Sequence, residues 1–243
     1  MSKAVRLDRL LANMGYGSRR EIEQMARAGW IVLDGQRVEK TDQRIAVDPS
    51  LSARMTVRGD PLDPPPGLTL MLHKPLGVTC SHKETGELVY GLLPARWRMR
   101  EPALSTIGRL DKETSGLLLL TDDGALLHRV ISPRSHVPKR YLATLDRPLT
   151  GDETAVFAAG TLLLEGEDKP LAPAILEVLG EREAALTVTE GRYHQVRRMF
   201  AAVGNHVTAL HRERIGALAL PDDLAPGAWR VMDTNAIALV FAG

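Results

Sequence analysis

One aspartate of the chain stands where a loop carboxylate could act on a substrate. Asp111 lies in the stretch Gly108-Arg109-Leu110-Asp111-Lys112-Glu113-Thr114-Ser115-Gly116, and four leucines follow at 117–120. A short apolar run of this kind is typical of a buried strand, whose rigid backbone would aim the carboxylate of the preceding loop into a cleft. A simpler interpretation is that Asp111 only caps a turn. On these residues alone both interpretations stay open.

Two further groups have the chemistry of a site. Tyr141 follows two cations in Lys139-Arg140-Tyr141, and the face of an aromatic ring binds a nucleobase at little entropic cost. Arg192, Arg197 and Arg198 surround the first turns of an expected helix, although cations are stabilising nearer a helix C-terminus. We therefore expect these arginines to lie beside a buried carboxylate or an RNA backbone.

The sequence does not support a metal centre, a nucleophilic serine or cysteine, or a phosphate-binding loop. Five histidines are scattered at 128, 136, 194, 206 and 211 without paired ligand spacing, and Cys80 is the only cysteine, so no metal centre is expected. There is also no nucleophile elbow and no glycine-rich phosphate loop. A single cysteine cannot form an internal disulfide, in agreement with a reducing compartment.

The elements that must position these side chains alternate between strands and helices. The absence of a regular strand–helix–strand repeat favours an α+β fold over a doubly wound one. The apolar patterns predict strands at 68–73, 116–120, 139–145, 174–179 and 184–189, and helices at 125–131, 153–159 and 193–203.

The first residues predict a small head. Leu7, Leu10, Leu11 and Met14 form one apolar helical face. A Ser-x-x-Glu capping box at 18–21 then opens a second helix, and Asp-Gly at 34–35 predicts the tight turn of a hairpin. Residues 60–67 contain four prolines, which predicts an extended, semi-rigid linker. We thus expect a head at 1–59, a linker at 60–67 and a larger domain at 68–243.

Composition places the chain among globular proteins, with 44% hydrophobic and 25% charged residues. Its apolar runs are too short for a membrane span, and the charged start does not resemble a secretory signal, so a cytoplasmic protein is expected. The net charge is only +1. Residues 1–59, however, hold eleven Lys and Arg against seven Asp and Glu. A basic head is typical of a module that grips RNA, although such an excess also occurs on ordinary solvated surfaces.

The head resembles the small RNA-binding module first described in a small-subunit ribosomal protein. The resemblance lies in Arg6-Leu7-Asp8-Arg9-Leu10-Leu11, Ser18-Arg19-Arg20 and Val32-Leu33-Asp34-Gly35-Gln36-Arg37-Val38. It implies binding to structured RNA by shape more than by sequence, with Arg6, Arg9, Arg19 and Arg20 as contacts.

The larger domain resembles the pseudouridine synthases, in the branch typified by RsuA, which carries the same head. The matching stretches are Gly-Arg-Leu-Asp at 108–111, Thr-Ser-Gly-Leu at 114–117, Thr-Asp-Asp-Gly at 121–124, Lys-Arg-Tyr at 139–141, residues 190–200 and residues 210–216. The resemblance spans essentially the whole chain. It implies a catalytic domain built on a mixed, largely antiparallel sheet with flanking helices. It also implies isomerisation of a uridine in RNA without a cofactor.

The resemblance implies a role for six residues. Asp111 would be the essential carboxylate, acting either as nucleophile on the sugar or as the base that starts an elimination. Arg197 would pair with Asp111 and keep it ionised. Tyr141 would stack on the extruded uracil, Val196 would pack beside the base, and Arg109 would enter the space that the base leaves. Lys74, preceded by His73 where the family pattern has Asn, would contact RNA.

The substrate is expected to be one uridine of small-subunit (16S) ribosomal RNA, because Leu-His-Arg-Glu-Arg-Ile-Gly at 210–216 is more similar to the small-subunit enzymes. Two alternatives remain: a synthase acting on large-subunit RNA, and a non-catalytic RNA-binding ribosome-assembly factor. The residues do not tell which uridine is modified. A monomer without a membrane partner is expected.

Overall fold

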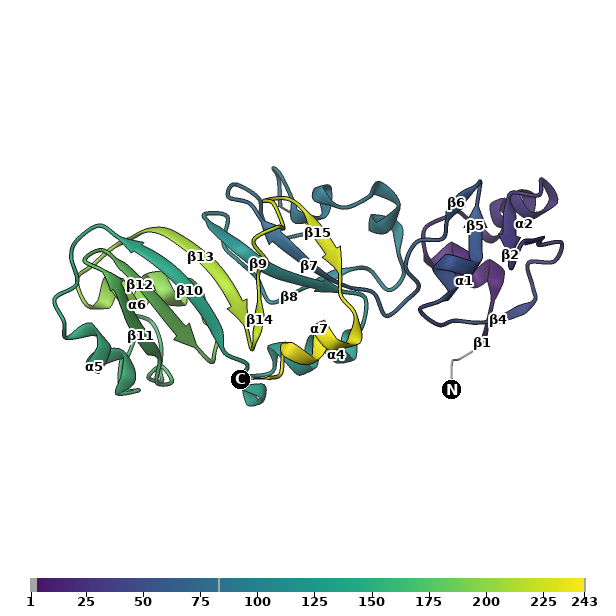
Figure 1. Cartoon of the computed structure of the whole chain (residues 1–243). Coiled ribbons are helices and arrows are strands. Elements are labelled where there is room, and N and C mark those ends of the chain that lie inside the picture. The colour runs from purple at the N-terminus through teal and green to yellow at the C-terminus, as the bar shows by residue number, and fades with distance from the viewer. Residues whose placement is uncertain (1–3, 83, 243) are drawn as a thin grey trace. The chain divides into compact units, whose positions relative to one another are not determined.

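The computed structural model describes residues 4–82 and 84–242 (Figure 1). Residues 1–3, which begin the stretch analysed for a secretory signal, lie outside the described residues, as do residues 83 and 243. The chain forms two compact units. The first contains the residues up to Leu68 together with Leu93–Ser105 and Thr121–Gly124, and the second contains the rest. Among the described residues, no helix is long and apolar enough to cross a membrane.

The first unit begins with the predicted head. The four apolar residues of its first helix are all buried, and they meet Ile22 and Met25 of the second helix in one core. Ser18 and Glu21 form the capping box in both directions, as predicted. The elements are β1 (Ala4–Arg6), α1 (Leu7–Asn13), α2 (Arg19–Arg27), β2 (Ile31–Leu33), β3 (Gln36–Arg37), β4 (Arg44–Ala46), α3 (Leu51–Arg54), β5 (Met55–Val57) and β6 (Asp60–Pro61).

The strands of the head form two small sheets. One pairs β1 with β4, and the other has the order β3-β2-β5-β6. Asp34 and Gly35, with φ of 52° and 78°, join β2 to β3. Both angles are positive, as a tight hairpin turn requires, so the predicted hairpin is confirmed.

Residues 60–67 contact the head. Asp60 and Pro61 form β6, and Leu62 is buried in the head core. Asp63 binds Arg96 at 2.6 Å, and its backbone N–H donates to the Tyr16 hydroxyl. The domain boundaries drawn from the sequence stay a prediction, but the first residues of this stretch are ordered against the head.

A buried ion pair joins distant parts of the first unit. Arg100 and Asp122 lie 3.0 Å apart, and their side chains are 1% and 2% exposed. Asp122 also accepts a hydrogen bond from the backbone of Gly67. Removing one partner of such a pair leaves a buried charge without compensation, typically at about 3–5 kcal/mol.

The second unit is built on a large mixed sheet. Within the described residues the order along its main path is β11-β12-β10-β13-β9-β7-β15, with β14 paired to β13 and β8 paired to β9. Its strands are β7 (Thr69–Lys74), β8 (Ser105–Ile107), β9 (Thr114–Thr121), β10 (Lys139–Leu145), β11 (Ile175–Gly180), β12 (Glu183–Val188), β13 (Val207–Ile215), β14 (Leu218–Ala219) and β15 (Trp229–Val231).

Strand β9 organises this sheet. It runs parallel to β13, whereas the β10–β12, β10–β13, β11–β12 and β7–β15 pairs are antiparallel. Its four leucines are buried on both faces, as the apolar run predicts. The predicted α+β fold with a mixed, largely antiparallel sheet is confirmed, and the loop before β9 enters the middle of the sheet.

The helices cover the sheet in two places. Helices α5 (Glu153–Ala158) and α6 (Gln195–Ala202) contribute to one core with β10, β12 and β13. Helices α4 (Gly124–Ile131) and α7 (Thr234–Leu239) contribute to another with β7, β9 and β13. Figure 1 shows α6 beside β12 and β10, and α7 beside α4. Short 3₁₀ turns lie at Val89–Leu92, Ala95–Met99 and Pro133–Ser135.

Candidate active site

Asp111 lies in the loop that leads from β8 into β9. Gly108 in this loop has a φ of 73°, a conformation that glycine adopts without steric cost. The backbone N–H of Thr114, the first residue of β9, donates to the carbonyl of Asp111 at 3.0 Å. The Asp111 carboxylate is therefore anchored at the start of a buried strand, while its side chain remains 34% exposed.

Lys74 lies beneath this loop. Its side chain is completely buried, and Nζ donates to the carbonyls of Pro75 and Thr114 at 2.9 Å and of Lys112 at 3.4 Å. Burial lowers the pKa of the Lys74 ammonium, against the opposing effect of the charges of Cys80, Asp111 and Glu113. The fully buried Lys74 side chain thus braces the Asp111 loop, and its contact with RNA stays a prediction.

Arg197 binds the same loop from helix α6. Its guanidinium donates to the carbonyl of Glu113 at 2.7 Å and to the carbonyl of Val207 at 2.8 Å. In the described part of the chain Arg197 forms no ion pair with Asp111, so the predicted pair is corrected. The reason is geometric, because the backbone carbonyls that precede β9 and begin β13 take the donors of Arg197.

The Asp111 carboxylate instead contacts His194. His194 Nε2 lies 3.2 Å from Asp111 Oδ1. His194 precedes the first residue of α6 in a left-handed conformation, with φ of 48°, and its ring stacks on Tyr193 at 3.9 Å between centroids. Sequence reasoning missed His194. Its spacing could have indicated a role, because His194 stands three residues before Arg197, and residues three apart project from nearly the same side of a helix.

The other two arginines of the cluster hold a neighbouring loop. Arg192 and Arg198 both bind Glu167, at 3.3 and 2.8 Å. They also donate to the carbonyls of residues 165, 169 and 170. The hydrogen bond from Arg198 keeps the pKa of Glu167 below its usual value. The expected carboxylate partner is therefore Glu167, which is partly exposed, and these two arginines stabilise the loop before β11.

Tyr141 lies on β10 opposite Arg212 of β13. Its hydroxyl accepts a hydrogen bond from Arg212 Nη1 at 3.3 Å, and its ring packs against the core cluster that contains Val196. Val196 itself is buried within that cluster. Arg212 was not singled out from the sequence, where it is one of several basic residues in 210–216.

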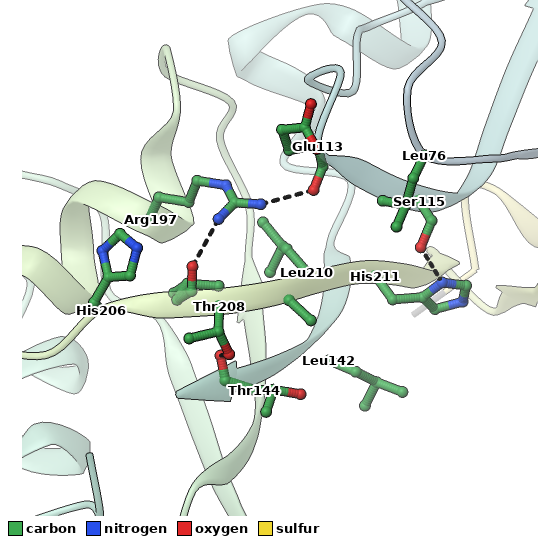
Figure 2. A pocket seen from close by; sticks show the side chains of 12 residues that line it. Leu76, Glu113, Ser115, Leu142, Thr144, Arg197, His206, Thr208, Leu210 and His211 are labelled. Atoms are coloured by element: carbon green, nitrogen blue, oxygen red, sulfur yellow. Dashed lines mark hydrogen bonds between the residues drawn. The ribbon is translucent and has the colours of Figure 1, made fainter. Parts of the chain in front are cut away.

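A pocket of about 360 Å³ opens beside Arg197 (Figure 2). In Figure 2 the Arg197 side chain spans from the helix toward Glu113, and Ser115 points toward His211, whose Nδ1 lies 2.9 Å from the Ser115 hydroxyl. Asp111 lies outside the lining, two residues before Glu113. The lining residues are Leu76, Glu113, Ser115, Leu142, Thr144, Arg197, His206, Val207, Thr208, Ala209, Leu210 and His211.

The remaining predicted RNA contacts lie at the surface. Arg109 is 67% exposed and approaches Glu84 at 3.6 Å. In the head, Arg6 makes two hydrogen bonds to the buried Asp8, which raise the pKa of Arg6. Arg19 and Arg20 are exposed on α2. Arg9 is exposed on α1.

Residues 69–202 match the model of the RNA pseudouridylate synthase family, and residues 5–48 match the S4 domain. The ribosomal small subunit pseudouridine synthase A of Yersinia pestis is 43% identical over 242 residues, which is 98% of this chain and 99% of that protein. The protein of the same name from Escherichia coli K12 is 40% identical over 240 residues, 97% of this chain and 100% of that protein.

A solved crystal structure of a pseudouridylate synthase is also similar. It shares 35% identity with a TM-score of 0.68, and the match covers 97% of this chain and 99% of that one. The matches confirm the family resemblance that was drawn from the motifs. The chain therefore belongs to the RNA pseudouridylate synthases, in the branch with an S4 domain at its head.

Proposed function

We propose that this enzyme isomerises one uridine of small-subunit ribosomal RNA to pseudouridine. Two relatives that carry this substrate in their names each align with at least 97% of the chain. In the chain itself, the proposal rests on the Asp111 loop. The carbonyls of residues 112, 113 and 114 are all bound by Lys74 or Arg197, which leaves the adjacent carboxylate fixed in place and accessible.

The reaction breaks one bond to the sugar and makes another. The pair of electrons of the bond between C1′ and N1 leaves with the uracil, which turns so that C5 bonds to the same C1′. C5 then loses its hydrogen as a proton, and N1 gains one. Asp111 either adds to C1′ as a nucleophile or removes a sugar proton and starts an elimination. In both routes a preorganised carboxylate lowers the barrier, because the loop needs no rearrangement at the moment of reaction.

The neighbouring side chains complete the site. Tyr141 offers its ring to the extruded uracil, and Val196 supports it from the core cluster behind. Extrusion costs on the order of a few kcal/mol, which contacts to RNA must offset. Arg109 is exposed in the Asp111 loop, where it can enter the space that the base leaves. His194 contacts Asp111 directly, and Arg197 holds its loop.

The head supplies the grip on RNA. Arg9, Arg19 and Arg20 are exposed on α1 and α2 and are available for phosphates, whereas Arg6 is already bound to Asp8. The enzyme acts as a monomer in the cytoplasm, where ribosomal subunits assemble, because a head and a catalytic domain on one chain grip RNA without a symmetry mate.

The test of the proposed function is release of tritium from uridine labelled at C5, in small-subunit rRNA and its assembly intermediates. The wild type should release tritium, and Asp111→Asn should release none. Asp222→Asn, at an exposed carboxylate of the same unit, is the matched control and should act as the wild type. Tight RNA binding without release would favour the assembly-factor alternative, and release from large-subunit rRNA alone would overturn the proposed substrate.

The head is tested best in the full-length protein. Deleting it would also expose the segment that it contacts, since Glu101 N–H donates to the carbonyl of Asn13 and Arg96 lies over the Tyr16 ring. Replacing Arg19 and Arg20 by Gln should weaken binding and lower the slope of log affinity against log salt by about two units. Arg27→Gln is the control, because Arg27 is bound to Glu23 at 2.6 Å. An unchanged slope would argue against phosphate contacts by α2.

A further inference from the structure

Arg212 is a buried cation in the middle of the large sheet. It lies on β13, between β9 and β10, and only 2% of it is exposed. Among the described residues, no carboxylate lies within ion-pair distance of its guanidinium. Burying a charge without a partner is costly, so a position of this kind calls for a physical explanation.

The guanidinium makes hydrogen bonds to neutral groups on the two flanking strands. Nε donates to the carbonyl of Leu117 on β9 at 2.8 Å, and Nη1 donates to the Tyr141 hydroxyl on β10 at 3.3 Å. Nη2 is buried and has no hydrogen-bond partner within the described residues. An unmade buried donor typically costs about 1–3 kcal/mol. Stability alone therefore does not account for an arginine here.

The backbone around Arg212 is specialised to hold it there. Gly116 faces Arg212 across the parallel β9–β13 pair and has a φ of 114°. A Cβ at position 116 would lie 2.2 Å from the Arg212 carbonyl oxygen and 2.6 Å from its nitrogen. Only glycine at 116 lets β13 approach closely enough for the guanidinium to reach both Leu117 and Tyr141.

Two further cations lie near Arg212, the fully buried Lys74 and the partly buried Lys139. Burial is the largest cause that lowers the pKa of Lys74 and of Lys139, and the charge of Arg212 lowers both further. Three cations therefore gather near Asp111 and Tyr141, and the charges of Cys80, Asp111 and Glu113 oppose the effect of burial on the pKa of Lys74. A site of this kind favours a ligand or an intermediate that becomes negative.

We propose that Arg212 is a positioning residue for Tyr141. It fixes the phenol ring through the hydroxyl, so that the ring presents one defined face to the uracil. Its uncompensated charge favours the uracil when that base takes the electron pair of the bond from C1′ to N1. This inference rests on the proposed function, because it takes the stacked uracil as the substrate base. It adds Arg212 to the residues that serve the reaction, with a role that is exerted through Tyr141.

The test is a double-mutant cycle on the rate of pseudouridine formation at saturating RNA. Tyr141→Phe keeps the stacking ring and removes only the acceptor, and we expect a rate about tenfold lower. Arg212→Met should lower the rate about 100-fold, with an unchanged KM. In the double variant the rate should equal that of Arg212→Met alone, since the hydroxyl acts only through Arg212. The cycle of Tyr141→Phe with Arg214→Met, an exposed neighbour on β13, is the control and should be additive.

Two measurements separate positioning from folding and from the proposed function. The free energy of unfolding in urea, measured for each variant, shows how much of a decrease in rate is due to a loss of folded protein. If Arg212→Met does not fold, Arg212→Lys replaces it, because lysine keeps the positive charge but lacks the forked donors of arginine. NMR of ¹³C-labelled tyrosine follows the Tyr141 ring among the four tyrosines of the chain. The ring should have one defined environment in the wild type and an averaged one in the Arg212 variants.

The outcomes decide the inference clearly. Rate effects that multiply in the Tyr141–Arg212 cycle, or a Tyr141 ring that is equally ordered without Arg212, would overturn it. If the wild type released no tritium from any RNA, the proposed function would fail, while the NMR measurement would still decide whether Arg212 positions Tyr141.

Discussion

The guanidinium of Arg197 donates to the carbonyl oxygen of Glu113 at 2.7 Å, two residues after Asp111 in the chain. This bond connects helix α6 to the loop that carries the carboxylate. Lys74 binds the carbonyls on either side of Glu113, from beneath the loop. The cations of the site thus act mainly on the backbone that carries Asp111, and the side chain itself is left to contact His194.

Removing Arg197 should impair the reaction more than the fold. Arg197→Ala frees two carbonyls, at residues 113 and 207, so the free energy of unfolding should fall by about 1–3 kcal/mol. The rate at saturating RNA should fall about 100-fold, because a small displacement of Asp111 is enough to misplace it. Arg198→Ala, on the same helix, should lose stability without this loss of rate, since Arg198 binds Glu167. Equal rate losses in both variants would contradict a specific role for Arg197.

His194 offers a separate test of the Asp111 contact. Asparagine tolerates the left-handed backbone at this position, so His194→Asn removes the imidazole without added strain. Without the imidazole beside it the Asp111 carboxylate should be held less firmly, so the rate should fall about tenfold, with RNA affinity unchanged. His136→Asn is the control, because His136 is exposed and also has a positive φ, of 47°. A normal rate in His194→Asn would show that the contact is dispensable.

Periodicity and turn chemistry predicted most of the elements. The capping box at Ser18, the Asp-Gly hairpin and the four-leucine strand follow from local rules, and the structure has all three. The fold class followed from the alternation of strands and helices. The motifs also identified Asp111, Tyr141 and Arg197 as one constellation, and the structure brings their strands and helix together in one unit.

The partners of the site residues could not be predicted in the same way. Whether Arg197 binds a carboxylate or a main-chain carbonyl depends on the path of the backbone at residues 113 and 207, which no spacing encodes. The sequence around Lys74 is typical of a loop at a strand end, yet in the structure the Lys74 side chain is completely buried. Arg212 became recognisable only when β9 and β10 were placed on either side of β13, since these strands are far apart in the sequence.

Gly116 should tolerate no side chain. Gly116→Ala forces a Cβ against the backbone of Arg212, where neither strand can give way. We expect the free energy of unfolding to fall by roughly 2–4 kcal/mol and the folded fraction to be nearly inactive. Gly124→Ala is the matched control, because a Cβ at Gly124 meets nothing within 4 Å and the residue opens helix α4. Urea unfolding and tritium release on both variants check this, and a stable, active Gly116→Ala protein would rule out the close approach.

Lys139 should make stability depend on pH in the alkaline range. Burial, and next the charge of Arg212, lower the pKa of Lys139 from 10.5 to about 8 in the folded protein. Between these two values the unfolded chain binds more protons than the folded one, so stability rises as the pH increases from about 8 to about 10.5. Below this window the partly buried Lys139 ammonium stays charged in both states, and its unfavourable contribution to the free energy of folding is fully present.

Lys139→Met should therefore stabilise the protein relative to the wild type at pH 7, and this advantage should shrink by on the order of 1–3 kcal/mol by about pH 10. Urea unfolding of both proteins at the two pH values measures the change directly. Lys112→Met, at an exposed lysine, controls for the loss of one positive charge. If the difference in the free energy of unfolding between wild type and Lys139→Met were the same at both pH values, the Lys139 ammonium would be well solvated in the folded state. Burial and the charge of Arg212 would then not lower its pKa.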